Sequence, residues 1–173
     1  FNLNSGRITK IQSGKYYVST GGEMKICTAK GSLKIKSDGL VTGDAVEIEN
    51  DVITKVLPRK NRLYRPNVAN IDLVAIVASN PPEPDFYLFD KLISSCTIKD
   101  IKVTIVVNKL DLEDTTAKKT EENYSSAVEK IFRISAKTGE GTAGFFDFLK
   151  GKTVVFSGQS AVGKTSILNR LFD

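Results

Sequence analysis

The stretch that decides the fold is Gly158-Gln159-Ser160-Ala161-Val162-Gly163-Lys164-Thr165, which fits the pattern G-x-x-x-x-G-K-[ST]. It follows an apolar run at residues 153–156 and precedes apolar residues at helical spacing up to Leu171. We therefore expect a strand, a loop and a helix in succession, which is the context that a phosphate-binding loop requires. An ordinary glycine-rich turn is the alternative, and the flanking strand and helix argue against it.

The residues of this loop have distinct expected roles. Backbone N–H groups of a glycine-rich loop can point inward at a phosphate, and the following helix adds the positive end of its dipole. Lys164 is expected to reach the β- and γ-phosphates of a nucleotide, and the Thr165 hydroxyl to ligate Mg²⁺. These two are therefore the predicted catalytic residues. The predicted phosphate-binding residues are Gly158, Gln159, Ser160, Ala161, Val162, Gly163, Lys164, Thr165 and Ser166.

Upstream of the loop, buried strands alternate with helices. Residues 71–78 and 103–107 are nearly continuous apolar runs, as expected of strands buried on both faces of a parallel sheet. Shorter strands are predicted at 131–134 and 153–156, and helices at 85–99, 113–130 and 144–149. This alternation predicts a doubly wound α/β domain over residues 71–173.

Asn108-Lys109-Leu110-Asp111 follows the second buried strand, at the carboxyl end where open α/β sheets bind their ligands. Guanine presents its N1–H and 2-amino donors side by side, and a single carboxylate, that of Asp111, can accept both. Facing adenine, which lacks this pair, Asp111 would lose on the order of 1–3 kcal/mol. Asn108 is expected to tie neighbouring loops to the base, and the Lys109 stem to cover one face of the ring. A solvated turn is the alternative for so short a motif.

Ser135-Ala136-Lys137 follows the third predicted strand, and residues 138–141 form a turn directly after it. We expect the Ala136 N–H to donate to the guanine 6-oxo group and Lys137 to stack opposite Lys109. As a lone tripeptide this motif would mean little. Three motifs that each follow a strand reinforce one another, and together they predict GTP or GDP bound with Mg²⁺.

Residues 6–57 consist of short β-prone runs separated by glycines. The runs, which alternate apolar and polar residues or are rich in β-formers, lie at 7–11, 16–20, 24–28, 33–36, 45–49 and 52–56. Five or six short strands within about fifty residues predict a small closed barrel, OB-like or SH3-like, over residues 1–57.

Residues 58–70 are predicted to be a basic linker between the two domains. Pro58 ends the last strand, and the basic side chains that follow include Arg59, Lys60, Arg62 and Arg65. Residues 1–67 carry a net charge of +6 and residues 68–173 carry −1, so the basic excess belongs to the N-terminal part. Two interpretations stay open for these residues: a solvated linker, or a strap that contacts RNA phosphates.

The bulk composition favours a soluble globular protein, with 40% hydrophobic and 26% charged residues. No apolar run approaches the roughly 20 residues that span a bilayer, and no signal peptide is recognisable. We therefore expect a cytoplasmic protein with no membrane partner, and a monomer by default. The chain has no histidine and two distant cysteines, Cys27 and Cys96, so both are expected to be reduced, partly buried thiols rather than zinc ligands.

The order of the three motifs carries a resemblance to a known family. Ras-like GTPases place the phosphate loop first and the NKxD and SAK motifs last, whereas here NKLD and SAK precede the phosphate loop. An OB-like barrel before such a domain resembles the RsgA/YjeQ family of ribosome-small-subunit-dependent GTPases. Gly43-Asp44 and residues 58–72 are similar to that family's barrel end and domain junction. The resemblance implies an N-terminal all-β OB-like barrel followed by a circularly permuted α/β P-loop GTPase domain.

The resemblance also implies GTP hydrolysis stimulated by the small (30S) ribosomal subunit, a role in late 30S maturation, and contact of the barrel with ribosomal RNA. The family usually has glycine where this chain has Ala161, a change that only a positive φ would make unfavourable. Its switch threonine, its Asp-x-x-Gly motif and its C-terminal zinc module are expected beyond Asp173. The chain is thus expected to be truncated after the phosphate-loop helix and to hydrolyse GTP slowly by itself.

Two other functions remain compatible with the residues alone. One is a P-loop ATPase or kinase in which NKLD has no role. The other is a non-catalytic RNA-binding module in which the nucleotide is structural.

Overall fold

The computed structural model describes residues 5–34, 39–112 and 115–172. They form two compact units, Phe1–Ile71 and Asp72–Asp173. None of the helices in the described ranges combines the length and the apolar character needed to cross a membrane.

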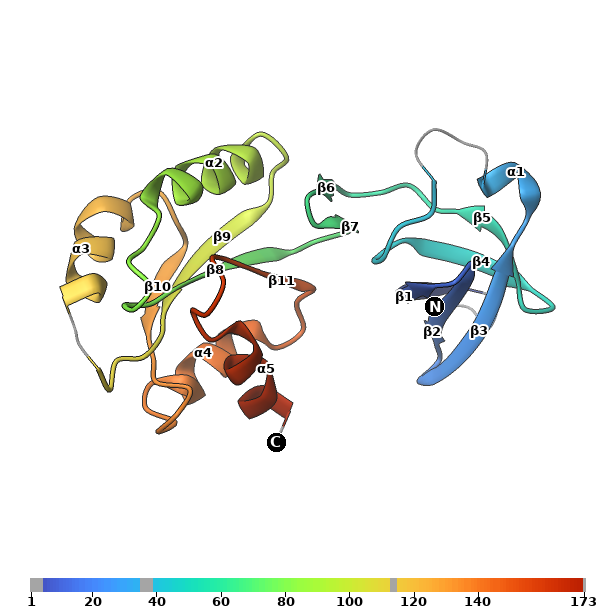
Figure 1. Ribbon diagram of the computed structural model, residues 1–173. Helices are drawn as coiled ribbons and strands as arrows, with labels where there is room; N and C mark the ends of the chain where they lie inside the picture. The colour runs from blue at the N-terminus through green and yellow to red at the C-terminus, as the bar shows by residue number, and fades with distance from the viewer. Residues whose placement is uncertain (1–4, 35–38, 113–114, 173) are drawn as a thin grey trace. The chain divides into compact units, whose positions relative to one another are not determined.

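The first unit is built on a closed five-stranded barrel (Figure 1). Its strands are β1 (Ser5–Gln12), β2 (Lys15–Thr20), β3 (Glu23–Ala29), β4 (Ala45–Glu49) and β5 (Val52–Val56). They pair in the order β1-β2-β3-β5-β4, and β1 pairs with β4 to close the barrel. Residues from every strand, among them Ile8, Val18, Cys27, Val46 and Ile53, fill the core. The predicted OB-like barrel is confirmed.

The segment predicted as a strand at 33–36 is different in the structure. Residues Gly31–Lys34 form the short helix α1, and residues 35 and 36 lie outside the described residues. The Leu33 N–H donates to the Lys30 carbonyl, and the Leu33 side chain packs against the barrel core. One apolar side chain can pack against the core from a helical turn as well as from a strand. The alternation of apolar and polar residues at 33–36 was therefore too short to distinguish the two.

Residues 58–70 also differ from the predicted linker, because the structure includes them in the first unit. Strands β6 (Arg62–Tyr64) and β7 (Asn67–Ala69) form an antiparallel hairpin. The Ala69 N–H donates to the Thr42 carbonyl and the Asn70 side-chain amide to the Gly43 carbonyl, each at 2.9 Å. A backbone N–H and a side-chain amide that an extended linker would leave to water are thus bonded to residues of the barrel unit.

The second unit is a parallel sheet covered by helices on both faces. Its strands are β8 (Leu73–Ala78), β9 (Lys102–Val107), β10 (Lys130–Arg133) and β11 (Val154–Ser157), in the order β10-β9-β8-β11. Its helices are α2 (Phe86–Thr97), α3 (Thr115–Tyr124), α4 (Thr142–Leu149) and α5 (Lys164–Phe172). Helices α2 and α3 cover one face, and α4 and α5 the other (Figure 1). The predicted doubly wound α/β sheet is confirmed.

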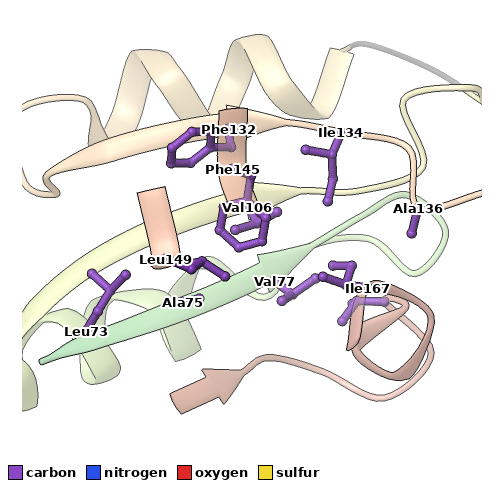
Figure 2. Close-up of a cluster of buried hydrophobic side chains, with 11 residues drawn as sticks. Leu73, Ala75, Val77, Val106, Phe132, Ile134, Ala136, Phe145, Leu149 and Ile167 are labelled. Carbon is purple, nitrogen blue, oxygen red and sulfur yellow. The ribbon is translucent and has the colours of Figure 1, made fainter. Parts of the chain in front are cut away.

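The core of the second unit anchors the helix that follows the phosphate-loop motif. All six residues of β8 are buried. Leu73, Ala75 and Val77 belong to the cluster that includes Ile167 of α5 and the α4 side chains (Figure 2). Ile167 is fully buried, so the first turn of α5 is fixed to the sheet by packing. A rigid base of this kind is what a precisely placed binding loop requires.

Both cysteines are free and buried. Desolvation by burial is the main cause that raises the pKa of the Cys27 thiol and of the Cys96 thiol. A raised pKa keeps the reactive thiolate form scarce near neutral pH. The two residues therefore act as small buried apolar side chains, and Cys27 belongs to the barrel core.

Candidate nucleotide-binding site

The structure brings the three sequence motifs together at one edge of the sheet. Asn108 directly follows β9, Ser135 lies two residues after the end of β10, and Gly158 directly follows β11. Because the four strands are parallel, their carboxyl ends lie at the same edge. A pocket of about 400 Å³ opens there, lined by Asn108, Lys109, Asp111, Leu112, Ala136, Lys137, Gly163 and Ser166.

The phosphate-loop motif wraps around its own lysine. Lys164, the first residue of α5, donates from Nζ to the Gly158 carbonyl at 2.9 Å and to the Gln159 carbonyl. Ser160 and Thr165 are exposed beside it. The Gln159 side chain accepts the Asp85 N–H at 3.0 Å, which ties the loop to the residue that caps α2. This last contact has no signal in the sequence, because Asp85 and Gln159 are far apart in the chain.

Asn108 joins the phosphate loop to the Ser135–Lys137 loop. Its side chain is buried; Nδ2 donates to the Val162 carbonyl at 3.0 Å, and Oδ1 accepts the Ala136 N–H at 2.9 Å. Gly163 is required beside it, since its φ is +95° and a Cβ there would lie 2.3 Å from Asn108 Nδ2. The side-chain amide therefore acts as the bridge between two halves of the pocket.

The donation of the Ala136 N–H to the guanine 6-oxo group stays a prediction. In the structure this N–H donates to Asn108 Oδ1 at 2.9 Å. The physical reason is that a buried amide oxygen needs a hydrogen-bond donor, and the Ala136 N–H is the one that reaches it. Ala136 still lines the pocket through its other atoms.

The two lysines near the pocket have different surroundings. Lys109 Nζ donates to the Ala161 carbonyl at 2.9 Å and to the Pro81 carbonyl at 2.5 Å, so it holds the phosphate loop against the segment after β8. Lys137 is exposed, and its Nζ lies 4.0 Å from Asp111 Oδ2. Both lysines line the pocket.

Asp111 is held as a carboxylate by Ser135. Ser135 Oγ donates to Asp111 Oδ1 at 2.6 Å. That hydrogen bond is the main cause that lowers the pKa of the Asp111 carboxyl, helped by its own backbone N–H and the charges of Lys137 and Lys109, and opposed by desolvation. The side chain is 17% exposed and lines the pocket. At neutral pH the site thus presents a charged acceptor for hydrogen-bond donors.

Ala161 occupies a backbone conformation that favours glycine, since its φ is +63°. An L-residue in the left-handed region costs roughly 1–2 kcal/mol. We expect Ala161→Gly to raise the free energy of unfolding by up to about 1 kcal/mol, because the greater freedom of glycine in the unfolded chain offsets part of the relief. Urea denaturation measures the change.

The control for this substitution is Ala143→Gly, at an exposed position of α4, where glycine is expected to destabilise. A loss of stability in both variants would contradict the strain assigned to Ala161.

Two residues at the site carry no prediction from the sequence. Leu112, 58% exposed, lines the pocket next to Asp111. Its position directly after the NKLD motif could have indicated this, but the motif assigns no role to the residue that follows it. Arg170, on α5, donates to the backbone carbonyls of Ala136 and Lys137. Nothing in the sequence pairs Arg170 with a loop that lies more than thirty residues earlier.

The fold and the placement of the loops define a circularly permuted P-loop GTPase domain preceded by an OB-like barrel. The model of the RsgA GTPase family matches residues 56–173, and that of the RsgA N-terminal domain matches residues 5–55. The chain therefore belongs to the RsgA GTPase family.

Named relatives and solved structures agree with this assignment. The small ribosomal subunit biogenesis GTPase RsgA of Ruminiclostridium cellulolyticum is 39% identical over 99% of this chain and 59% of its own length. That of Carboxydothermus hydrogenoformans is 36% identical over 96% of this chain and 60% of its own. The crystal structure of YjeQ from Thermotoga maritima superposes with a TM-score of 0.86, at 34% identity, and covers 97% of this chain and 64% of that one. The chain spans about 60% of the length of the curated relatives it matches.

Proposed function

We propose that the pocket at the edge of the sheet binds GTP and GDP. In this proposal Asp111 accepts the two donors of guanine, and residues 158–166 bind the phosphates. The observation that carries it is the Asn108 bridge, which holds the loop of the base-reading residues and the phosphate loop in one pocket. The names of the matching relatives favour a GTPase over an ATPase or kinase.

The proposed metal is Mg²⁺, with the Thr165 hydroxyl as its ligand from this chain. Thr165 is exposed and lies one residue into α5, next to Lys164. A single hydroxyl oxygen fits Mg²⁺, since this ion takes few protein ligands and completes its shell with phosphate oxygens and water. When bound, the ion would neutralise charge on the phosphates. Lys164 would act on the same groups by moving its ammonium from the Gly158 carbonyl to a phosphate oxygen.

We further propose that the full-length protein hydrolyses GTP in the cytoplasm during maturation of the small ribosomal subunit, with the barrel unit contacting ribosomal RNA. The relatives' names and the basic excess of residues 1–67 support this proposal. Of the four basic residues predicted to contact RNA, Arg59 is hydrogen-bonded to Asp44 within the barrel unit. Lys60 and Arg65 are exposed, and Arg62 donates to Asn67 at the surface, so we assign the RNA contact to these three residues.

A nucleotide panel tests the binding part of the proposal. GDP is expected to bind at least about 100-fold more tightly than ADP, because a desolvated carboxylate facing adenine loses two acceptor contacts. Lys164→Ala is the control that should weaken GDP and ADP alike. ADP binding as tight as GDP binding would rule out the role of Asp111.

Turnover by the full-length protein tests the ribosomal part. Purified small subunits are expected to raise the rate of GTP hydrolysis, whereas large subunits are the matched control and should not. Small subunits that neither bind the protein nor raise its turnover would contradict this part of the proposal and leave the nucleotide site intact.

A further inference from the structure

Helix α5 contacts two parts of the pocket. Its first residue is Lys164, the lysine of the phosphate-loop motif, and near its other end Arg170 reaches the loop after β10. Arg170 Nε donates to the Ala136 carbonyl at 2.6 Å, and Nη2 donates to the Lys137 carbonyl at 3.0 Å. The two residues of α5 are about 9 Å apart along the helix axis at 1.5 Å per residue.

We propose that Arg170 is a positioning residue for guanine recognition, one that fixes the Ser135–Lys137 loop to the phosphate-loop helix without touching the nucleotide. This inference rests on the proposed nucleotide-binding function. Affinity for the guanine base then depends on a side chain outside the three motifs, which acts through its hydrogen bonds to the Ala136 and Lys137 carbonyls.

The Ser135–Lys137 loop is held by two hydrogen bonds at the same residue, Ala136. On one side the Ala136 N–H donates to Asn108 Oδ1, and on the other the Ala136 carbonyl accepts from Arg170. Asn108 in turn donates to the Val162 carbonyl. One contact therefore leads to Val162 in the phosphate loop and the other to α5, which begins at the end of that loop, so together they fix the position of the Ser135–Lys137 loop relative to the phosphate loop.

The helix can transmit this constraint because it is packed. Ile167, between Lys164 and Arg170, is fully buried in the core of the second unit. A packed helix does not stretch, so moving the Arg170 backbone away from the loop would require repacking Ile167. The distance between the phosphate-binding and base-binding ends of the pocket is thereby set by the length of α5.

The site is shaped for an arginine. A planar guanidinium offers N–H groups in a fixed fork that meets two neighbouring carbonyl oxygens, whereas a lysine offers a point charge. Gly139 leaves room for it, because a Cβ on Gly139 would lie 3.0 Å from Arg170 Nη1, at a φ of +92°. The glycine-containing turn after Lys137 and the arginine on α5 are therefore complementary in space.

The test measures the dissociation rate of a fluorescent GDP from full-length protein, and the affinity for inorganic pyrophosphate by competition. In Arg170→Ala, GDP dissociation is expected to be about tenfold faster, since two charge-assisted hydrogen bonds that order the loop are lost. Pyrophosphate affinity is expected to stay within about twofold of wild type, because the phosphate loop keeps its own contacts. Arg170→Lys is expected to fall between the two.

Asn169→Ala is the matched control, an exposed neighbour on the same helix, and it should leave both quantities unchanged. Arg170→Gln, which keeps side-chain length, replaces Arg170→Ala if that variant does not fold. An unchanged GDP dissociation rate would overturn the inference, and so would an equal weakening of GDP and pyrophosphate, which indicates a damaged helix. If wild-type protein fails to prefer GDP over ADP, the proposed function fails instead.

Discussion

Asp111→Asn is expected to change the preference of the pocket from guanine to xanthine nucleotides. The carboxylate accepts the N1–H and 2-amino donors of guanine, whereas an amide presents one acceptor and one donor. The donor meets the 2-amino group of guanine unfavourably and the 2-oxo group of xanthine favourably. Each mismatch or match of a desolvated polar group changes affinity by about 10- to 200-fold. The GDP/XDP affinity ratio is therefore expected to fall by roughly 1,000-fold.

The surroundings of Asp111 allow this substitution to act on recognition with little effect on the fold. Ser135 Oγ donates to Asp111 Oδ1 at 2.6 Å, and an asparagine oxygen can accept the same bond. The charges of Lys137 and Lys109 help to keep the pKa of the Asp111 carboxyl low, so wild type presents an ionised acceptor at neutral pH. The new amide thus inherits the position of the carboxylate but not its charge.

Competitive displacement of a fluorescent nucleotide by GDP and XDP measures the ratio. The control is Asp147→Asn, the same chemical change on α4, where the side chain is 71% exposed and paired with Lys150. That variant should keep the wild-type ratio. An unchanged ratio in Asp111→Asn would show that another group reads the base.

The elements of the second unit were predictable because their signals are local. A strand buried on both faces must consist almost entirely of apolar residues, and every residue of Leu73–Ala78 is apolar. The phosphate-loop motif, likewise, is contained in eight consecutive residues between a strand and a helix. What the sequence indicated about β8, β9, β11 and α5 therefore needed no knowledge of distant contacts.

The contacts that assemble the pocket were not predictable, because each joins residues far apart in the chain. The hydrogen bond from the Ala136 N–H to Asn108 Oδ1 joins two loops and has no signal in the sequence. Arg170 is an ordinary surface residue by sequence, and only the packing of α5 aims it at two carbonyls. Ala161 was partly predictable. The sequence indicated that its φ would matter, because the family usually has glycine at this position, and the structure gives a φ of +63°.

Arg59 illustrates the same limit in the first unit. By sequence it belongs to a run of basic residues, for which solvent or RNA phosphate is the natural partner. In the structure its guanidinium donates to both oxygens of Asp44, at 2.7 and 2.9 Å, and to the Gly39 carbonyl at 2.6 Å. Asp44 is fully buried and also accepts the Val41 N–H. A run of basic residues in the sequence does not reveal which of its side chains pairs with a buried acid.

Asp44→Ala is expected to destabilise the barrel by about 3–5 kcal/mol, because it leaves the Arg59 guanidinium without its buried counter-charge. Arg59→Ala is expected to have a similar effect, since the Asp44 carboxylate would then be buried and unpaired. Hydrogen exchange of the amides of β1 to β5 measures the loss directly. The double variant is expected to be more stable than the sum of the two single losses, because removing both charges leaves neither unpaired.

Glu47→Ala is the matched control, since Glu47 pairs with Lys55 at the surface and such exposed pairs contribute about 0–1 kcal/mol. GDP affinity is expected to remain at its wild-type value in all these variants, because the second unit has a core of its own.

The separate stability of the two units matters for the RNA proposal. A loss of subunit binding in Arg59→Ala would report an unfolded barrel, whereas the same loss in Arg65→Ala, at an exposed residue, with barrel exchange unchanged, would report a phosphate contact. Additive losses from Asp44→Ala and Arg59→Ala would show that the two charges do not depend on each other.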